Sequence, residues 1–267
     1  MKLAQFGLSL LLTTAASLPT TLAAPTTIAA TSVSPFTAAL AQNKTLEAKM
    51  DEAMAALNAG RYAESVAAFE AAIALNDTYA PAHIGKGYAL YHLERYDEAI
   101  AALQRGTELD STHEFAWMWL GITLDDAGRP QEALAQYAQA IALNPENAKV
   151  WFHQGITLQR LERYQEALLS YDKAVALQPN FERGWLSRGR MAGHLGQLEK
   201  ALQSFEQVLA LNSQNVDGWY YKGLMLMLLE RDQDAIVAFE RSLALNPNLA
   251  EAQEKIDAIR QRQQARN

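Results

Sequence analysis

The side chains that most often do chemistry in proteins are present in this sequence, but their spacing suits no reaction. No two histidines stand three or four residues apart, so no helical pair is placed to bind a metal ion. Adjacent carboxylates such as Asp125 and Asp126 diverge on a helix instead of converging on one atom. The histidines are His83, His92, His113, His153 and His194. The sequence therefore predicts no metal site.

The short motifs that mark catalytic sites are also missing. The glycine run of Gly189, Gly193 and Gly196 lacks the Gly-Lys-Ser/Thr ending of a phosphate-binding loop. There is no G-x-S-x-G elbow and no H-E-x-x-H. Because the chain has no cysteine, thiolate nucleophiles, disulfides and thiolate metal sites are excluded. We predict that the protein is not an enzyme and uses no cofactor.

Composition and charge limit the kinds of molecule that the protein can be expected to bind. Hydrophobic residues make up 49% of the 267 residues, which is enough to form a continuous core. The formal net charge is −7, and no Lys/Arg-rich run is present that could neutralise phosphates. We therefore predict no binding of nucleic acid.

The N-terminal residues predict export. Met1 and Lys2 precede an apolar stretch over residues 3–12, and small residues follow through Ala24. We predict a signal peptide over residues 1–24, with the cleavage site open, and a periplasmic or secreted protein. The alternative is an uncleaved membrane anchor, but an apolar core of about ten residues is half of a membrane span. No other segment of the sequence is long enough and apolar enough to span a bilayer, so we expect no membrane insertion after signal removal. Residues 25–45, rich in Thr, Ala, Pro and Ser, are predicted to be a linker.

The sequence repeats with a period of 34 residues, and the repeating elements determine where its side chains lie. A small residue repeats in phase without insertion, and a second small residue follows twelve residues later, as with Gly121 and Ala133. We expect these pairs to mark the close approach of two helices. The repeating residue is Ala53, Gly87, Gly121, Gly155, Gly189 and Gly223. Aligned on it, the units are 46–79, 80–113, 114–147, 148–181, 182–215 and 216–249, and an amphipathic C-terminal helix follows over 250–267.

The residues conserved between units resemble those of one known family. The unit 114–147 carries Trp117, Leu120, Gly121, Ala133, Tyr137, Ala140 and Pro145 at the places of the pattern W-x2-L-G-x2-Y, A-x3-F and P. Over all six units the chain resembles the tetratricopeptide repeat family. The resemblance implies an all-α, right-handed superhelical solenoid of six antiparallel helix pairs plus a C-terminal capping helix. We expect the in-phase tryptophans, Trp117, Trp151, Trp185 and Trp219, to belong to the core.

The turn inside each unit alternates between two residue types. Odd units carry Gly60, Gly128 and Gly196, and even units carry Glu94, Glu162 and Glu230. The alternation is consistent with the ancestral duplication of a two-unit segment.

The resemblance also implies where a ligand binds. In this family the first helices of successive units line a concave groove, in which repeat positions 2, 5, 9, 12 and 13 face a peptide. Here positions 5 and 9 are Met50 and Met54, Ile84 and Tyr88, Met118 and Ile122, Phe152 and Ile156, Leu186 and Arg190, Tyr220 and Leu224. The asparagines and lysines that clamp a carboxylate in chaperone-docking members are not reproduced. An apolar groove floor favours an apolar or amphipathic segment. The alternative is that these side chains are ordinary core residues.

Charged residues divide along the same positions. Lys149, Arg160, Arg183 and Arg190, together with Arg188, fall in units four and five, whereas Glu47, Asp125 and Asp126 fall in units one and three. We predict a basic wall over Phe152, Ile156 and Leu186 that suits a partner with apolar anchors and acidic residues or a free carboxylate. The alternative is a set of solvated surface charges.

The predicted function is that of a non-catalytic protein-interaction scaffold or assembly factor, which binds a protein or peptide partner in the groove. Two alternatives stay open. The same surface could drive self-association of a structural protein, or the chain could be a regulatory subunit of an envelope enzyme.

Overall fold

The computed structural model describes residues 35–266, and this part of the chain forms thirteen helices and no strand. The first helices of the six units are α1 (Pro35–Asn58), α3 (Ala80–His92), α5 (Glu114–Asp126), α7 (Ala148–Arg160), α9 (Glu182–His194) and α11 (Val216–Leu228). The second helices are α2 (Tyr62–Leu75), α4 (Tyr96–Leu109), α6 (Pro130–Leu143), α8 (Tyr164–Leu177), α10 (Leu198–Leu211) and α12 (Asp232–Leu245). The chain continues into α13 (Ala250–Arg266). The predicted signal peptide and the linker as far as residue 34 lie outside the described residues.

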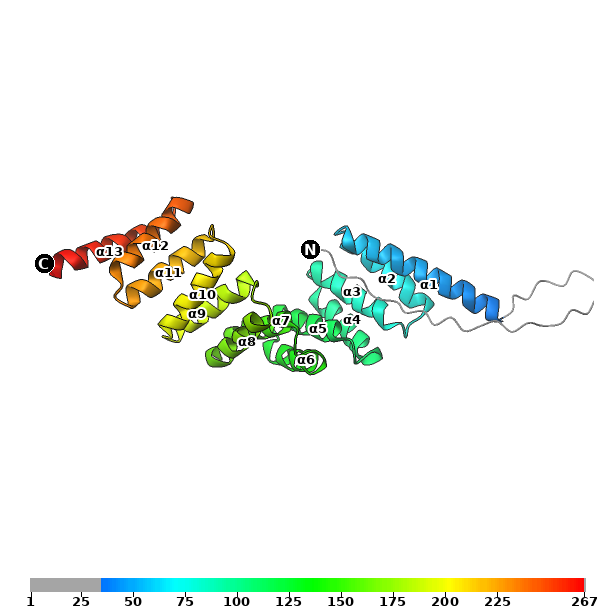
Figure 1. Ribbon diagram of the computed structural model, residues 1–267. Helices are drawn as coiled ribbons and strands as arrows, with labels where there is room; N and C mark the ends of the chain where they lie inside the picture. Colours follow the sequence, from blue (N-terminus) through cyan, green and yellow to red (C-terminus); the bar gives the residue numbers. More distant parts are fainter. Residues whose placement is uncertain (1–34, 267) are drawn as a thin grey trace, which may run out of the picture.

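The helices form an all-α solenoid. Each helix packs against the helix before it and the helix after it, and further contacts join successive first helices, such as α3 with α5 and α5 with α7. Figure 1 shows the resulting arc, in whose middle α5 and α7 lie on the inner side and α6 and α8 on the outer side. The predicted six helix pairs with a C-terminal helix are confirmed. Ala252, Ile256 and Ile259 of α13 are buried in a core shared with α12.

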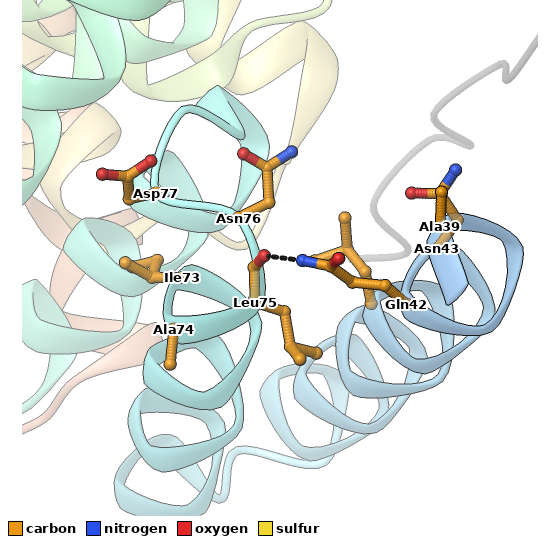
Figure 2. A pocket seen from close by; sticks show the side chains of 9 residues that line it. Ala39, Gln42, Asn43, Ile73, Ala74, Leu75, Asn76 and Asp77 are labelled. Carbon is orange, nitrogen blue, oxygen red and sulfur yellow. Dashed lines mark hydrogen bonds between the residues drawn. The ribbon is translucent and has the colours of Figure 1, made fainter. Parts of the chain in front are cut away.

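The first helix is longer than the sequence predicts. It begins at Pro35, so residues 35–45, expected to be linker, are helical. Proline is favoured at the first position of a helix, where its missing N–H would have no partner in any case. The Gln42 side-chain amide donates to the Leu75 carbonyl oxygen at 2.6 Å and so holds the added turns to the end of α2. Figure 2 shows this bond beside a recess of about 610 Å³ that Gln42, Ile73 and Asp77 help to line.

The glycines of the first helices face large side chains of the second helices. A Cβ atom added to Gly121 would lie 2.6 Å from Cε1 of Tyr137, and one added to Gly189 would lie 2.7 Å from Cε1 of Phe205. The close approach of two helices is confirmed, but the side chain nearest to each in-phase glycine is not the predicted small residue. It comes sixteen positions later, as Tyr137 does for Gly121. The residue twelve positions later also makes contact in two units: a Cβ added to Gly87 would lie 3.1 Å from the Ala99 carbonyl oxygen, and the Ser65 hydroxyl donates to the Ala53 carbonyl oxygen at 2.9 Å.

The in-phase tryptophans are half-buried, and each bonds the turn that precedes it. The indole Nε1–H of Trp151 donates to the Pro145 carbonyl oxygen at 2.8 Å, and that of Trp219 donates to the Ser213 carbonyl oxygen at 2.9 Å. Trp117 and Trp185 make the equivalent bond. Three of the four, Trp117, Trp151 and Trp219, also pack on the core. The prediction that these tryptophans are core residues is therefore only partly correct.

The turns inside the units share one backbone conformation although their residues alternate. Gly60, Gly128 and Gly196 have φ between 72° and 78°, and Glu94, Glu162 and Glu230 have φ of 57° or 58°. Units three and five share a further feature, in which a glutamate at the start of the unit accepts from two asparagines at its end. Glu182 accepts from Asn212 at 3.1 Å and from Asn215 at 2.6 Å. Glu114 accepts from Asn144 and Asn147 in the same way.

Ion pairs join neighbouring units beside the glycines. Lys86 Nζ lies 2.8 Å from Glu70 Oε1, and Lys222 Nζ lies 3.2 Å from Glu206 Oε1. Arg188, at the same repeat position, is buried with Asp172, whose Oδ1 lies 2.6 Å from its Nε. These pairs join α3, α9 and α11 to the second helix of the unit before them.

Candidate interaction surface on the first helices

The fifteen residues predicted to face a ligand all lie on first helices, but they differ in exposure. Ile84, Met118, Ile122 and Phe152 are buried. The other apolar residues, Met50, Met54, Tyr88, Ile156, Leu186, Tyr220 and Leu224, are half-buried. The four cations, Lys149, Arg160, Arg183 and Arg190, are exposed. The buried residues fit the interpretation as core, and the half-buried ones fit the interpretation as a groove floor. That the half-buried and exposed residues bind a ligand stays a prediction.

Three of the cations form what we call the basic patch: Lys149 on α7, and Arg183 and Arg190 on α9. Among the described residues, none of the three pairs with a carboxylate within 4.0 Å. The Arg183 guanidinium lies 5.5 Å from the ring centre of Phe152, and that of Arg190 lies 5.4 Å from the ring centre of Tyr221. Contact with a ring holds a guanidinium in place without neutralising it.

Two other arginines of the predicted basic wall have partners inside the molecule. Arg160 Nη1 lies 3.0 Å from Asp125 Oδ2 and 3.2 Å from Asp126 Oδ1. The predicted acidic pair and this predicted basic residue therefore neutralise each other in part. Arg188 is buried between Asp172 and Ser204. The basic wall is thus narrower than predicted.

Two cations of the basic patch act on the same side chain, His153. Burial and then the positive charge of Arg183 lower the pKa of its imidazole to about 4, and Lys149 acts in the same direction. The ring is therefore neutral at pH 7 and adds no charge to the patch. Its environment is nevertheless positive, because two cations act on it against the single carboxylate of Asp126.

A second group of side chains, which we call the aromatic cluster, lies between α3 and α5: Tyr88, Tyr91, Phe115 and Trp119. The ring centres of Tyr88 and Trp119 are 4.6 Å apart in an edge-to-face arrangement, and those of Tyr91 and Trp119 are 5.1 Å apart. Phe115 lies 5.9 Å from both Tyr88 and Trp119. All four side chains are half-buried.

The aromatic cluster was missed because only Tyr88 of its four residues was named as facing a ligand, although Phe115 and Tyr91 hold the ligand-facing repeat positions 2 and 12. A signal was present in the sequence. Of the five tryptophans, Trp119 alone is out of phase with the repeat, so the helix packing common to all units does not require it.

Other kinds of site have no support in the described part of the chain. Residues 35–266 contain no group of three or more His, Asp or Glu side chains placed to hold a metal ion. No helix in the same range combines the length and the apolar character needed to cross a bilayer. A row of stacked helix pairs, each in contact with its neighbours, defines the class of α-helical repeat proteins.

The comparison with family models places the chain within this class. Residues 50–114, 119–180 and 186–254 match a model described as tetratricopeptide repeat, and together they make up more than half of the chain. The protein belongs to the tetratricopeptide repeat family. Proteins of this family generally mediate protein–protein interactions, and their fold is typically a non-catalytic scaffold.

Solved structures support the fold. The chain is similar to YrrB, described as a TPR protein with an unusual peptide-binding site, with a TM-score of 0.63 and 24% identity over 70% of this chain and 96% of that one. It is similar to PilF of Pseudomonas aeruginosa, with a TM-score of 0.68 and 17% identity over 80% and 97% of the two chains. For MamA of Desulfovibrio magneticus the TM-score is 0.58 and the identity 19%, over 64% and 96%. A comparison with curated protein sequences gives no match.

Proposed function

We propose that the protein is an interaction scaffold whose first-helix face binds an acidic segment of another protein. The observation that carries the proposal is the basic patch: three exposed cations without carboxylate partners in a chain whose formal net charge is −7. Most other described arginines have a carboxylate within 4.0 Å, as Arg129 has Glu132 and Arg163 has Glu166. Cations left unpaired on neighbouring helices attract an anionic partner.

The arrangement of the arginines suits carboxylates in particular. A guanidinium held against a ring keeps its planar set of N–H donors, which matches the two oxygens of a carboxylate. The half-buried Ile156 and Leu186 lie on the same two helices and offer apolar contact area beside the charges. A segment with apolar anchors and acidic residues would use both. That YrrB is described as having a peptide-binding site is consistent with this use of the fold. The export predicted from residues 1–24 would put the partner in the periplasm or outside the cell.

The experiment identifies the partner first and then tests the patch. A photoreactive residue at Ile156 is crosslinked in the native cell, and the captured segment is identified by mass spectrometry and made as a synthetic peptide. Its Kd is then measured for the unchanged protein and for the double variant Arg183→Glu with Arg190→Glu. Because the variant puts two negative charges where we propose carboxylates bind, we expect the Kd to rise at least about tenfold.

The matched control reverses two unpaired cations elsewhere. Lys173 of α8 and Arg241 of α12 are exposed on second helices, and Lys173→Glu with Arg241→Glu changes the net charge by the same amount. We expect this variant to bind the peptide with less than about a twofold change at 0.15 M salt. Equal binding by both double variants, with unchanged circular dichroism, would rule out the proposal. Light scattering of the protein alone separates it from self-association, which would raise the mass with concentration.

A further inference from the structure

The aromatic cluster ends at a pair of carboxylates. Asp125 and Asp126 close α5, and the Tyr91 hydroxyl donates to Asp126 Oδ2 at 2.8 Å. The last turn of a helix carries partial negative charge on its free carbonyl groups, which adds to the charge of the two carboxylates. Aromatic faces and negative charge at one place are the combination that binds guanidinium and ammonium groups.

The charge of one of the two carboxylates is only partly compensated. The Asp125 side chain is only 6% exposed, and its Oδ2 pairs with Arg160. Its Oδ1 is buried and has no hydrogen-bond partner among the described residues. A buried carboxylate oxygen without a donor leaves the negative charge of Asp125 incompletely compensated, which favours a further cation close to this edge.

The charges around the cluster favour a cation. Within residues 35–266, Arg160 is the one cation paired with the two carboxylates. The ring centre of His92 is 4.6 Å from that of Tyr88 and 6.0 Å from that of Trp119, and burial lowers the pKa of its imidazole, which favours the neutral ring. Two carboxylates against one guanidinium leave a net negative charge. Arg160 also shows the chemistry directly, since it is a guanidinium bound at this edge with half of its side chain exposed.

We propose that the aromatic cluster and the Asp125–Asp126 edge form a subsite for a basic side chain, an arginine or lysine of the protein segment that the first-helix face binds. This proposal rests on the proposed function, because the basic side chain would belong to the protein segment that the first-helix face is proposed to bind. It also gives the segment a direction, with a basic residue over α3 and α5 and acidic residues over α7 and α9.

The test observes Trp119 directly. In the full-length ¹⁵N-labelled protein, five tryptophans give five indole N–H signals, and Trp119→Phe identifies the one that belongs to the cluster. The probes are N-acetyl-arginine amide and N-acetyl-norleucine amide, which share an unbranched aliphatic stem, and only the arginine probe carries a positive charge. We expect the arginine probe to shift the Trp119 signal with a Kd about fivefold below that of the norleucine probe.

Two variants with opposite expected effects make the result specific. Asp126→Asn removes a negative charge and should abolish the preference for arginine, whereas Arg160→Gln removes the resident cation and should increase it. The other four indole signals report whether a variant keeps its fold, because those tryptophans donate to turn carbonyls.

Some outcomes would overturn the proposal. If norleucine binds as tightly as arginine, the cluster is an apolar anchor, and if neither probe moves the Trp119 signal, it is not a binding site. The Arg183→Glu with Arg190→Glu variant should respond to the arginine probe like the unchanged protein. Failure of the acidic-segment proposal and failure of this one are therefore distinguishable.

Discussion

At the scale of single residues, the in-phase glycine in five of the six first helices sets how closely the two helices of a unit approach. We predict that Gly121→Ala destabilises the protein by about 1–3 kcal/mol, because the new Cβ would lie 2.6 Å from the buried Tyr137 ring. Urea unfolding followed by circular dichroism measures the change.

The control for this prediction is a glycine with flexible surroundings. A Cβ added to Gly193 would meet the Met225 sulfur at 3.2 Å, and a thioether side chain can move aside. We expect Gly193→Ala to change stability by less than about 1 kcal/mol, since alanine also favours the helix. If Gly121→Ala unfolds at the same urea concentration as the parent, the close contact with Tyr137 does not limit the helix spacing.

The same residues show what the sequence could predict at this scale. The spacing of small residues indicated a close helix contact, but it could not show how far one antiparallel helix is shifted along the other, so Ala133 was chosen instead of Tyr137. Asp126 and Arg160 were assigned to separate charged regions for a related reason. They hold the same position in neighbouring units and meet only because successive first helices lie side by side.

At the scale of helices, Asp172 of α8 joins two helices of the next unit. It accepts from the buried Arg188 of α9 at 2.6 Å and from Lys200 of α10 at 2.7 Å. We predict that Asp172→Asn destabilises the protein by about 2–3 kcal/mol, because a buried guanidinium loses its counter-charge. Thermal and urea unfolding measure the loss.

An equivalent but exposed pair provides the comparison. Glu70 of α2 pairs with Lys86 of α3 at the same repeat positions, and the Glu70 side chain is 53% exposed. We expect Glu70→Gln to change stability by no more than about 0.5 kcal/mol, because water replaces most of the lost interaction. Similar losses from both changes would mean that burial does not decide the strength of these inter-unit pairs.

The helices also show which parts of the candidate site could be predicted. Lys149, Arg183 and Arg190 were found because they occupy ligand-facing repeat positions and the structure leaves them exposed. The aromatic cluster depends on a contact between rings of two units, such as Tyr88 with Trp119. A pattern read one unit at a time does not contain that contact.

At the scale of the whole molecule, every substantial contact among the described helices joins a helix to its neighbour or to the next but one. Stability in such a molecule is a sum of local terms, and the ends have neighbours on one side only. We predict that hydrogen exchange is fastest at residues 39–45 of α1 and at the end of α13, and slowest in α5 to α10. Exchange followed by mass spectrometry tests this order. Simultaneous exchange of all helices would show instead that the solenoid unfolds as one unit.

The overall fold was the most predictable part, because a period of 34 residues without insertions determines the order and pairing of the helices. The start of α1 was not predictable in this way. Residues 35–45 lie outside the repeat, and their helix depends on contacts such as that between Gln42 and Leu75.

The neighbour-only contacts have a mechanical consequence. No substantial contact ties α1 to α13, so small rotations at the unit junctions add up along the chain. The solenoid could therefore change its pitch, and with it its end-to-end length, like a spring, while each junction between units moves little. The carboxylates that close α5 and the arginines of α9 are at different points along this spring. A bound segment that contacts both groups would fix the distance between them and so the length of the solenoid.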